Sequence, residues 1–515
     1  GVRMVPIGHE ISKGMIEVKG EPLIERLIKQ LRDAGIQDIS IVVGYMKEMY
    51  DYLIDEYSVK LIMNREYSNK NSYYSLLLAE NILSNTYVVP CDVYFKENPF
   101  SENELYSWYM VGEETSQTSN VRMNRKKELV RVPDFGGDRM LGTAYFTKDV
   151  SRKIIENLKK IDESPRLADT WWEEAAFSGD RLLMYARFAD KDQCSEVNTY
   201  DELRRLDSKS KDLESRAIEL SAEILDVSKE DITNLESVKT GMTNRSFIFR
   251  CNGTRYIMRI PGEGTETMIS RQGEYEAYQA VKDMNLSDEV IYIDPKTGYK
   301  LTRFIEDSRL SDYNNEEDMR KCFRILHRLH DKKLKTSVSW DIYEKLELYE
   351  SMWNGEKSIY RDYDEVKKKV YSLKPFIDEH KQEYVLTHMD PAAENFLFST
   401  DENGKEKISL IDWEYASMFD PFFDLVAYCE YTGLDRDWVD HTIDIYFEEW
   451  GRECDYDTRT LIYCYFSAVG LMWANWCEAK RLMGADFFDY SMNQYRYAKV
   501  FYKIAIERIG GGKNA

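Results

Sequence analysis

One short stretch of the chain places a histidine, an aspartate and an asparagine at i, i+2 and i+7: LTHMDPAAENFLF, residues 386–398. The runs NFLF and ISLID that follow are separated by the turn-rich STDENGKEK, which predicts a β-hairpin. Because a hairpin brings its ends together, we expect Asn395 beside Asp412. Their oxygens are ligands that Mg²⁺ prefers, and Asp390 is placed to accept the proton of an attacking hydroxyl. The alternative is that these residues only cap turns.

The segment before this stretch offers groups that can bind phosphates. KTGMTNRSF, residues 239–247, lies between two predicted strands and can present backbone N–H groups from a loop. Arg259 lies in the apolar strand YIMRI, and Glu274 lies on the helix that follows. A phosphate-binding cation held by a helix carboxylate is the arrangement of kinases, although that cation is ordinarily lysine. The alternative is a solvent-exposed strand arginine. The candidate loop residues are Thr240, Gly241, Thr243 and Asn244.

The elements that must position these residues form two kinds of pattern. Short strands with one inserted helix (270–284), followed by nearly continuous helix after residue 315, predict a β-rich small lobe at 210–307 and a helical lobe at 308–515. Residues 22–92 instead alternate helix with strand, which predicts a Rossmann-like α/β domain over residues 1–209 with a mostly parallel sheet. Ligands of such sheets bind at the carboxyl ends of strands, where Asp92 lies.

Composition narrows the class of function. The chain has 515 residues and a formal net charge of −22, which disfavours nucleic acid or an anionic membrane as partner. Its eight cysteines show no CxxC spacing, which favours a reduced cytoplasmic location over a zinc site or disulfide framework. The longest apolar run, residues 461–477, is short for a bilayer and contains polar residues, so we expect a buried helix. The sequence does not indicate an oligomeric state.

Residues 230–515 resemble the superfamily of choline kinases and aminoglycoside phosphotransferases. THMDPAAENFLF matches its H-x-D-x-x-x-x-N catalytic loop, and LIDWEYA matches its metal-binding D-x-E-Y segment. The resemblance implies a protein-kinase-like fold that uses ATP and Mg²⁺. It also implies roles for six residues: Asp390 as catalytic base, Asn395 and Asp412 as magnesium ligands, His388 as support for the loop, and Arg259 with Glu274 as the nucleotide-positioning pair.

Two tryptophans point to the substrate of this half. Trp473 and Trp476 lie at i and i+3 of a predicted helix, and indole faces can hold a quaternary ammonium by cation–π attraction. Glu414 and Tyr415, which follow the predicted metal aspartate, are further candidates for binding choline. The W-x-x-W pattern is similar to that of choline kinases, which favours choline, with ethanolamine as a close competitor. The alternative is that both tryptophans pack in the core.

The amino terminus, GVRMVPIGHEISKGMIEVKGEP, resembles the nucleotidyltransferases that activate sugars and phosphocholine. Arg3 matches their R-M-x-P segment, and Lys13 matches the lysine of P-K-x-L, with Ser12 in place of proline. Both cations are expected to act in catalysis by neutralising a nucleoside triphosphate and the phosphate that attacks it. The printed chain begins at Gly1, without the family's first strand and most of its Gly-rich loop, so either the sequence is trimmed or this site is incomplete.

Further matches extend this resemblance. VVPCDVYF resembles the strand that delivers a metal-binding aspartate, here Asp92, and SEVNTYDEL resembles the late metal segment, with Asn198 aligned and Glu196 as the alternative ligand. DTWWEEA can close over a choline head group, although an ordinary amphipathic helix explains it nearly as well. Residues of DTWWEEA and of NKNSYYSL complete the candidates: Trp171, Trp172 and Glu173 for choline, Asn71 and Ser75 near the base.

Together the two halves predict a bifunctional enzyme without nucleic acid or membrane insertion. The carboxyl half is expected to phosphorylate choline with ATP, and the amino half to join phosphocholine to CMP from CTP, giving CDP-choline. CTP as the nucleotide comes from the resemblance alone. The alternatives are a kinase for ethanolamine, another amino-alcohol or an aminoglycoside, fused to a sugar-type nucleotidyltransferase or to an inactive nucleotide-sensing domain.

Overall fold

A computed structural model describes residues 4–9, 11–177, 182–190, 192–238, 244–262, 269–401, 403–430, 436–482 and 487–511. The chain divides into two compact units. The amino-terminal unit comprises Gly1–Lys239 and Phe247–Gly253, and the carboxyl-terminal unit comprises Thr240–Ser246 and Thr254–Ala515. The boundaries predicted at residues 209 and 307 stay predictions.

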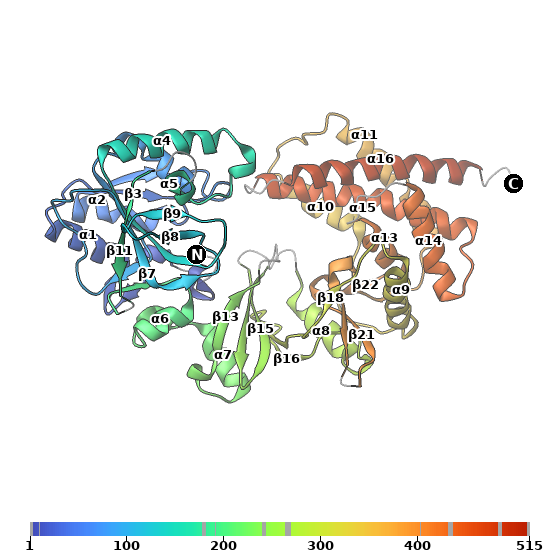
Figure 1. Ribbon diagram of the computed structural model, residues 1–515. Helices are drawn as coiled ribbons and strands as arrows, with labels where there is room; N and C mark the ends of the chain where they lie inside the picture. Colours follow the sequence, from blue (N-terminus) through green and yellow to red (C-terminus); the bar gives the residue numbers. More distant parts are fainter. Residues whose placement is uncertain are drawn as a thin grey trace. The chain divides into compact units, whose positions relative to one another are not determined.

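The amino-terminal unit begins with the predicted helix–strand alternation (Figure 1). Helix α1 (Leu23–Asp33) buries a stripe of leucines and isoleucines at helical spacing and ends before Gly35, whose φ is +90°. Strand β3 (Ser40–Val43) pairs in parallel with β4 (Lys60–Met63). Between them lie a 3₁₀ turn, η4 (Lys47–Tyr50), and helix α2 (Tyr52–Tyr57).

The larger sheet of this unit has the strand order β11-β7-β10-β5. Its strands are β5 (Thr86–Val88), β7 (Trp108–Ser116), β10 (Gly137–Phe146) and β11 (Tyr185–Ala189). Strand β11 is parallel to β7, whereas β10 is antiparallel to both β7 and β5. The α/β class is therefore confirmed, but the pairing is mixed rather than mostly parallel. The reason is that β7 and β10 pair directly with each other, without a crossover helix between them.

The amino-terminal unit contains further strands, helices and 3₁₀ turns. Its hairpin strands are β1 (Glu17–Val18), β2 (Glu21–Pro22), β8 (Val121–Met123) and β9 (Leu129–Arg131), and β6 (Val93–Phe95) pairs with β12 (Cys194–Glu196). Its other helices are α3 (Ser72–Leu78), α4 (Lys148–Asp162), α5 (Glu173–Phe177), α6 (Tyr200–Leu206) and α7 (Arg216–Leu225). Its 3₁₀ turns are η2 (Ile7–His9), η3 (Lys13–Met15), η5 (Glu80–Ile82), η6 (Pro165–Leu167), η7 (Lys211–Leu213) and η8 (Lys229–Asp231). Strands β13 (Thr233–Ser237) and β14 (Arg245–Cys251) form an antiparallel pair.

The carboxyl-terminal unit opens with short antiparallel strands, as predicted. Strand β15 (Thr254–Ile260) pairs with β17 (Lys300–Arg303), which pairs with β16 (Val290–Ile293). Helix α8 (Arg271–Val281) and the 3₁₀ turn η10 (Lys282–Met284) lie between β15 and β16 in the chain. The strands confirm the expected β-rich segment with a single inserted helix.

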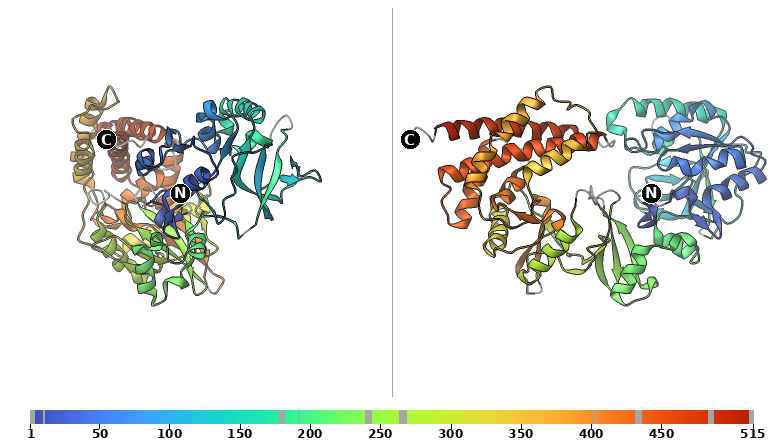
Figure 2. Two further views of the ribbon diagram at one scale, coloured as in Figure 1. Left: turned by 90° about the vertical axis from the view of Figure 1, so that its left-hand side faces the viewer. Right: turned by 180° about the vertical axis from the view of Figure 1, so that it is seen from behind.

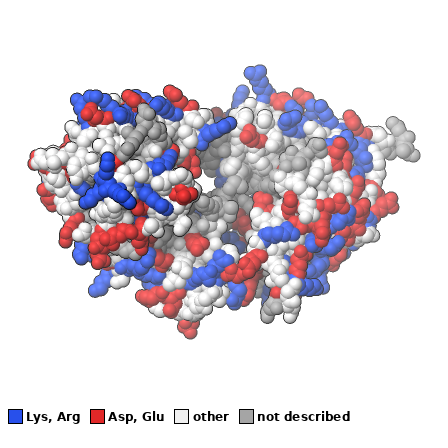
Figure 3. All heavy atoms as spheres, in the orientation of Figure 1, with Lys and Arg blue, Asp and Glu red and all other residues white. Residues whose placement is uncertain are grey.

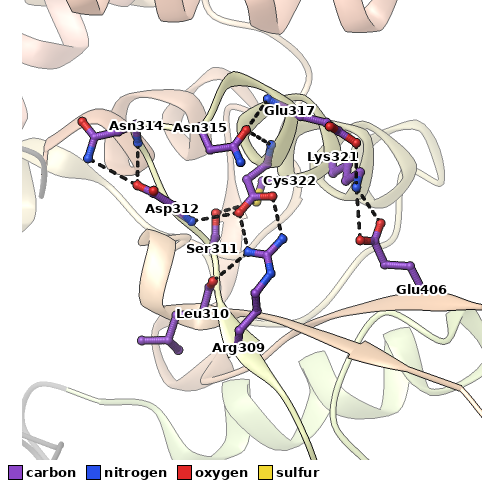
Figure 4. A network of polar contacts seen from close by, with 11 residues as sticks. Arg309, Leu310, Ser311, Asp312, Asn314, Asn315, Glu317, Lys321, Cys322 and Glu406 are labelled. Carbon is purple, nitrogen blue, oxygen red and sulfur yellow. Dashed lines mark hydrogen bonds and ion pairs between the residues drawn. The ribbon is translucent and has the colours of Figure 1, made fainter.

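A polar network fixes the chain where it passes from these strands to the helices (Figure 4). Arg309 in β18 (Arg309–Leu310) donates to the Asp318 carboxylate, to its Oδ1 at 2.8 Å and its Oδ2 at 2.5 Å. Asp318 is buried in the first turn of α9 (Glu316–Asp331), and its Oδ2 also accepts a hydrogen bond from the Asp312 backbone N–H. Asn315 caps the same helix with its side-chain oxygen. The entry to the helical part is thus held by charge as well as by packing.

The rest of the unit is mainly helical, as expected beyond residue 315. Its helices are α10 (Ile342–Ser351), α11 (Tyr363–Tyr371), α12 (Lys374–His380), α13 (Phe422–Glu430), α14 (Arg436–Trp450), α15 (Tyr456–Leu482) and α16 (Phe488–Gly511). Its strands are β19 (Val385–Thr387), β20 (Phe396–Thr400), β21 (Glu406–Leu410) and β22 (Ser417–Phe419), with 3₁₀ turns η11 (Ala393–Asn395) and η12 (Trp413–Tyr415).

Helices α15 and α16 lie side by side in all views (Figures 1 and 2). They approach closely at Gly470, where a Cβ atom would come within 2.6 Å of the Gln494 carbonyl oxygen and 2.8 Å of the Ala498 backbone nitrogen. The apolar run 461–477 lies within α15 and is almost entirely buried, which confirms the expected core helix. No helix in the described part of the chain has the length and apolar character needed to cross a bilayer.

The surface mixes both signs of charge. Acidic and basic side chains alternate over the face drawn in Figure 3. Many are ion-paired, as in the cluster where Arg320 contacts Glu316, Glu448 and Glu449. On the face drawn in Figure 3, the acidic side chains therefore do not form one continuous block.

Candidate active sites

The β20–β21 hairpin brings Asn395 and Asp412 together, as the sequence predicted. The register pairs Phe396 with Leu410, and the Ile411 backbone N–H donates to the Asn395 carbonyl oxygen at 2.9 Å. Asp412 follows directly and has left-handed backbone angles, φ 67° and ψ 62°. A non-glycine residue there costs about 1–3 kcal/mol, and such conformations cluster at functional sites. The hairpin thus fixes a carboxylate beside an amide.

The Asn395 side chain is oriented by the loop that precedes it. Its amide nitrogen donates to the Asp390 carbonyl oxygen at 2.8 Å, and it lies 3.5 Å from the Asp390 Oδ2 atom. Because these contacts use the amide nitrogen, the amide oxygen lies on the other branch of the side chain, away from Asp390. Asp390 itself is half-buried. The structure thus brings the predicted base, Asp390, close to both predicted metal ligands, Asn395 and Asp412.

A buried aspartate that the sequence analysis missed holds this loop. Asp424 accepts hydrogen bonds from the His388 backbone N–H at 3.0 Å and the Met389 backbone N–H at 2.8 Å. Its Oδ2 atom also lies 2.8 Å from Nε2 of His330. Met389, with φ 70°, precedes Asp390, so Asp424 stabilises a strained peptide next to the predicted base. A single acid inside the apolar run PFFDLVAY was the available signal.

His388 supports the loop through its ring. Nε2 lies 3.0 Å from the Ile411 carbonyl oxygen, one residue before Asp412. Burial lowers the pKa of His388, so the ring is neutral and donates its Nε2–H to that carbonyl. The contact ties the catalytic-loop segment to the hairpin strand, in the supporting position expected from the sequence.

Arg259 and Glu274 form a buried, two-pronged ion pair. The Arg259 nitrogens Nη1 and Nη2 each lie 2.6 Å from a different oxygen of the Glu274 carboxylate. Arg259 is only 6% exposed and Glu274 1%, so the alternative of a solvent-exposed strand arginine is wrong. The two cations Arg259 and Lys300 lower the pKa of Glu274 to about 2 against the opposing effect of burial.

The predicted phosphate loop is seen only in part. Thr240, Gly241 and Thr243 lie outside the described residues. The Asn244 amide nitrogen donates to Oε2 of Glu414, which also lies 3.9 Å from Nη1 of Arg259. Glu414, predicted beside choline, is thus placed against the predicted nucleotide-binding residues.

The two predicted substrate tryptophans lie in contact but in different environments. Their rings meet edge to face with centroids 5.8 Å apart. Trp476 is buried and packs on Phe487, whereas the partly exposed Trp473 donates its indole N–H to Oε2 of Glu430 at 3.0 Å. The core-packing alternative therefore fits Trp476 better than Trp473.

Glu430, the last residue of α13, was not predicted. It is 2% exposed, and burial raises the pKa of its carboxyl group well above the usual range, with the Asp390 charge acting in the same direction. Burial also raises the pKa of Tyr415, helped by the charges of Glu414, Asp390 and Asp412. A protonated phenol and a buried acid thus share the electrostatic environment of Asp390. The only sequence signal for Glu430 was one acid that ends an apolar helix.

In the amino-terminal unit, Lys13 joins two residues that were predicted as metal ligands. Its ammonium lies 3.0 Å from Oδ2 of Asp92 and 2.7 Å from Oδ1 of Asn198. The β6–β12 pair and the hydrogen bond from the Val197 N–H to the Asp92 carbonyl oxygen, at 2.8 Å, bring these distant segments together. One lysine, one carboxylate and one amide therefore meet, as the resemblance implied.

The turn that carries Lys13 is closely packed. A Cβ atom on Gly14 would come within 2.8 Å of the Tyr50 hydroxyl, which shares a 2.7 Å hydrogen bond with Ser12. Burial raises the pKa of the Cys91 thiol to about 12, so that residue packs as a neutral thiol beneath the turn. Only glycine fits at position 14 without displacing Tyr50.

Two acids next to Asn198 have separate tasks. Glu202 accepts hydrogen bonds from the Asn198 and Thr199 backbone N–H groups, at 2.8 and 3.0 Å, in a capping box that starts α6. Glu196, the alternative metal ligand, is ion-paired with Nη2 of Arg139 at 2.7 Å. Asn198 is therefore positioned by a helix cap, while Glu196 already has a cationic partner.

The other candidates of this unit include residues that line a cavity and residues that pack in the core. Trp172 is buried against Tyr109 and Phe146, which makes it a packing residue, whereas Trp171 is 58% exposed. Glu173 accepts from the Tyr109 hydroxyl at 2.9 Å, and burial raises its pKa. One cavity is lined by residues that include Lys13, Ser75, Asp92, Trp171, Glu173, Glu196 and Asn198.

The remaining candidates are Asn71, Ser75 and Arg3. Asn71 caps α3 by accepting from the Ser72 N–H at 2.7 Å, and Ser75 accepts from Nδ2 of Asn64 at 3.0 Å. Arg3 lies outside the described residues.

Both halves match known families. Residues 235–448 match the choline/ethanolamine kinase family, and residues 1–102 match the MobA-like NTP transferase domain. A choline-phosphate cytidylyltransferase of Streptococcus pneumoniae is 28% identical over 212 residues, which are 40% of this chain and 93% of that protein. A 2-aminoethylphosphonate cytidylyltransferase of Lancefieldella rimae is 29% identical over 182 residues, 34% of this chain and 74% of that protein.

One solved structure with a related sequence is that of the choline kinase LicA from Streptococcus pneumoniae. It is 27% identical, and the match covers 56% of this chain and 99% of that chain with a TM-score of 0.48. The chain thus joins an amino-terminal nucleotidyltransferase domain, with choline-phosphate cytidylyltransferase homologues, to a carboxyl-terminal domain of the choline/ethanolamine kinase family.

Proposed function

We propose that the chain is a bifunctional enzyme that makes CDP-choline. The carboxyl-terminal unit transfers the γ-phosphoryl group of ATP to choline, and the amino-terminal unit joins the resulting phosphocholine to CMP from CTP, releasing pyrophosphate. One observation carries the proposal: a choline/ethanolamine kinase domain is fused to a domain whose relative is a choline-phosphate cytidylyltransferase. The product of one reaction is the substrate of the other.

In the kinase reaction, Asp390 accepts the proton of the choline hydroxyl as its oxygen attacks the γ-phosphorus of ATP, and ADP leaves. Asp424 and His388 hold the loop so that the Asp390 carboxylate keeps its position. Arg259, held by Glu274 in the β-rich segment, is the proposed cation for the phosphates of ATP. These residues position the reactants and neutralise phosphate charge, which is most of what phosphoryl transfer requires of a protein.

The oxygens of Asn395 and Asp412 fit a magnesium ion, because both are hard donors and the hairpin holds them together. Among the described residues no three His, Cys, Asp or Glu side chains cluster as a metal site, but Mg²⁺ commonly takes one or two carboxylates and completes its shell with substrate phosphates and water. Bound there, Mg²⁺ offsets negative charge on the transferred phosphoryl group.

The choline head group is proposed to lie by Trp473, Glu430 and Tyr415. A quaternary ammonium donates no hydrogen bonds, so it is held by aromatic rings and by negative charge. Trp473 supplies a partly exposed indole, and its N–H fixes one oxygen of Glu430. A bound cation favours the ionised form of that buried carboxyl group. Trp476 supports the Trp473 ring from the core side.

In the second reaction a phosphate oxygen of phosphocholine attacks the α-phosphorus of CTP in line, and pyrophosphate leaves. Lys13 stabilises the charge that develops on the reacting phosphates. Asp92 and Asn198 supply oxygens that suit Mg²⁺, which adds positive charge at the triphosphate when bound. Trp171 and Glu173 are the proposed contacts for the choline head group. Arg3 stays a predicted second cation.

A second candidate for the amino-terminal unit is a cytidylyl acceptor with a primary ammonium. The relative that acts on 2-aminoethylphosphonate favours it, because that phosphonate is similar in size to phosphoethanolamine. The kinase family description likewise includes ethanolamine. A primary ammonium would donate hydrogen bonds to a carboxylate such as Glu173 or Glu430, whereas choline would not.

One incubation with Mg²⁺, ATP, CTP and either choline or ethanolamine, followed by phosphorus NMR, tests the proposal. We expect phosphocholine first and CDP-choline next. Phosphocholine that accumulates without CDP-choline would remove the amino-terminal activity from the proposal. No phosphorylated product from any amino-alcohol would remove the kinase activity. A parallel sample with CTP and 2-aminoethylphosphonate decides between the two cytidylyl acceptors.

A further inference from the structure

A second buried cation contacts the Arg259–Glu274 pair. Lys300, in β17, donates to Oε1 of Glu274 at 3.1 Å and to the Tyr278 hydroxyl at 2.9 Å. Its ammonium also lies 4.7 Å from the centre of the Tyr278 ring. Lys300 is 7% exposed, so this contact is not a solvated surface ion pair. The kinase mechanism above gives Lys300 no role.

The sheet register explains why the two cations share one acid. Arg259 in β15 lies directly opposite Lys300 in β17. Cross-strand partners on one face have side chains that point the same way, here toward Glu274 on α8. Glu274 Oε1 receives hydrogen bonds from Nη1 of Arg259 and from Lys300, while its Oε2 is held by Nη2 of Arg259.

Both terminal nitrogens of Arg259 are engaged in this arrangement, whereas its Nε–H is buried and has no hydrogen-bond partner among the described residues. Both terminal nitrogens bond to Glu274, and Nη2 also donates to the Gly298 carbonyl oxygen at 3.1 Å. Because the Nε–H is buried, we expect a terminal nitrogen to contact a nucleotide phosphate, and that nitrogen must then release its bond to Glu274. A buried carboxylate that loses its only cation is costly, so Arg259 alone would resist this movement. Lys300 keeps Glu274 compensated from the other side.

We propose that Lys300 is a positioning residue for ATP: it retains the Glu274 carboxylate when Arg259 turns one arm of its guanidinium to the β- and γ-phosphates. This inference rests on the proposed kinase activity. Lys300 touches neither substrate nor reacting atoms, and its effect reaches the nucleotide only through Glu274 and Arg259. Its loss therefore weakens the part of nucleotide binding that depends on the outer phosphates and leaves the adenosine part unchanged.

The test compares ATP with AMP as ligands of the full chain. For Lys300→Met we expect the Kd of ATP to rise about tenfold, the scale of one charge-assisted hydrogen bond, while the Kd of AMP stays within about twofold. Lys300→Arg, which retains the cation, restores most of the ATP affinity. Lys296→Met, in the turn before β17, is the matched control because its exposed side chain has no part in the network.

The outcomes separate this inference from the proposed function. If Lys300→Met lowers the affinities for ATP and AMP equally, or lowers neither, Lys300 does not act through the outer phosphates and the inference is overturned. If the wild-type chain neither binds ATP nor phosphorylates any amino-alcohol, the proposed kinase activity itself is wrong. Should Lys300→Met fail to fold, Tyr278→Phe removes the other contact of the Lys300 ammonium and must show the same selective loss of ATP affinity.

Discussion

The Asn395 amide nitrogen donates a hydrogen bond to the Asp390 carbonyl oxygen, at 2.8 Å, so the amide that faces the proposed metal position is oriented by the residue proposed as catalytic base. The two functions are therefore coupled through one peptide group. A change at Asn395 removes a hydrogen bond to the peptide that carries Asp390, while the amino-terminal site is built from separate segments.

Asp390→Asn is expected to lower choline phosphorylation about 10²–10⁴-fold, because an amide cannot accept the hydroxyl proton. Cytidylyl transfer from added phosphocholine should stay at the wild-type rate. Phosphorus NMR of the two reactions, run separately, measures both. Asp378→Asn, an exposed helix residue, is the control. A variant that retains near-normal phosphorylation would show that Asp390 is not the base.

Lys13→Met is expected to have the opposite pattern. Cytidylyl transfer should fall about 10²–10³-fold because one preorganised charge is lost from the reacting phosphates, while choline phosphorylation is unchanged. Pyrophosphate release from CTP and phosphocholine is the measurement, with Lys47→Met, exposed on η4, as the control. An equal loss of cytidylyl transfer and choline phosphorylation in Lys13→Met would indicate that Lys13 acts only in folding.

Trp473→Phe should raise the KM for choline about 3–30-fold, since it removes the indole N–H that holds Glu430 and weakens the cation–π contact. The KM for ATP should not change. Steady-state kinetics with each substrate varied in turn distinguish these effects. Trp476→Phe serves as the comparison, because its buried ring is expected to affect the melting temperature more than choline affinity. A raised KM for ATP in Trp473→Phe would contradict the assignment.

Glu430 should make choline binding and stability depend on pH in opposite directions. Because burial raises its pKa, the carboxyl group ionises only well above the usual range, and choline, which favours the ionised form, should bind more tightly as pH rises. In the absence of choline, the unfolded chain releases this proton at a lower pH than the folded chain does. The free energy of unfolding therefore falls as pH rises from the ordinary glutamate pKa toward the raised value.

The measurement for Glu430 is denaturant unfolding with and without choline across this pH range. Glu430→Gln should flatten both pH dependences and weaken choline binding at the upper end. If the variant keeps the wild-type pH dependence of choline affinity, another group is responsible for it.

Sequence patterns predicted those parts of the structure that depend on residues close together in the chain. Two apolar runs around a turn fixed the register that places Asn395 beside Asp412. Short-range pairing rules connect these two residues, so no knowledge of distant packing was needed. The pairing of Arg259 with Glu274 was instead expected from the arrangement of kinases and from the family resemblance, and the structure adds that both side chains are buried.

The residues that sequence reasoning missed depend on contacts between distant segments. Asp424 and Glu430 are single acids in apolar helical runs, and their partners lie 36 and 43 positions away at His388 and Trp473. Trp172 was a candidate because of its aromatic ring and Asn71 because of the family resemblance, yet Trp172 packs on Tyr109 and Asn71 caps α3. The mixed sheet likewise followed from long strands whose pairing partners the pattern did not specify.

The close approach of α15 and α16 at Gly470 has a consequence for the evolution of substrate choice. Any side chain at this position would meet main-chain atoms of α16 and push the two helices apart. Trp473 lies three residues further along α15, so a shift of α15 against α16 would also displace its indole. We therefore expect substitutions along α16, such as at Ala498, to alter the proposed amine contact at Trp473 without touching the ligand. Selection for a new amine need not begin in the pocket.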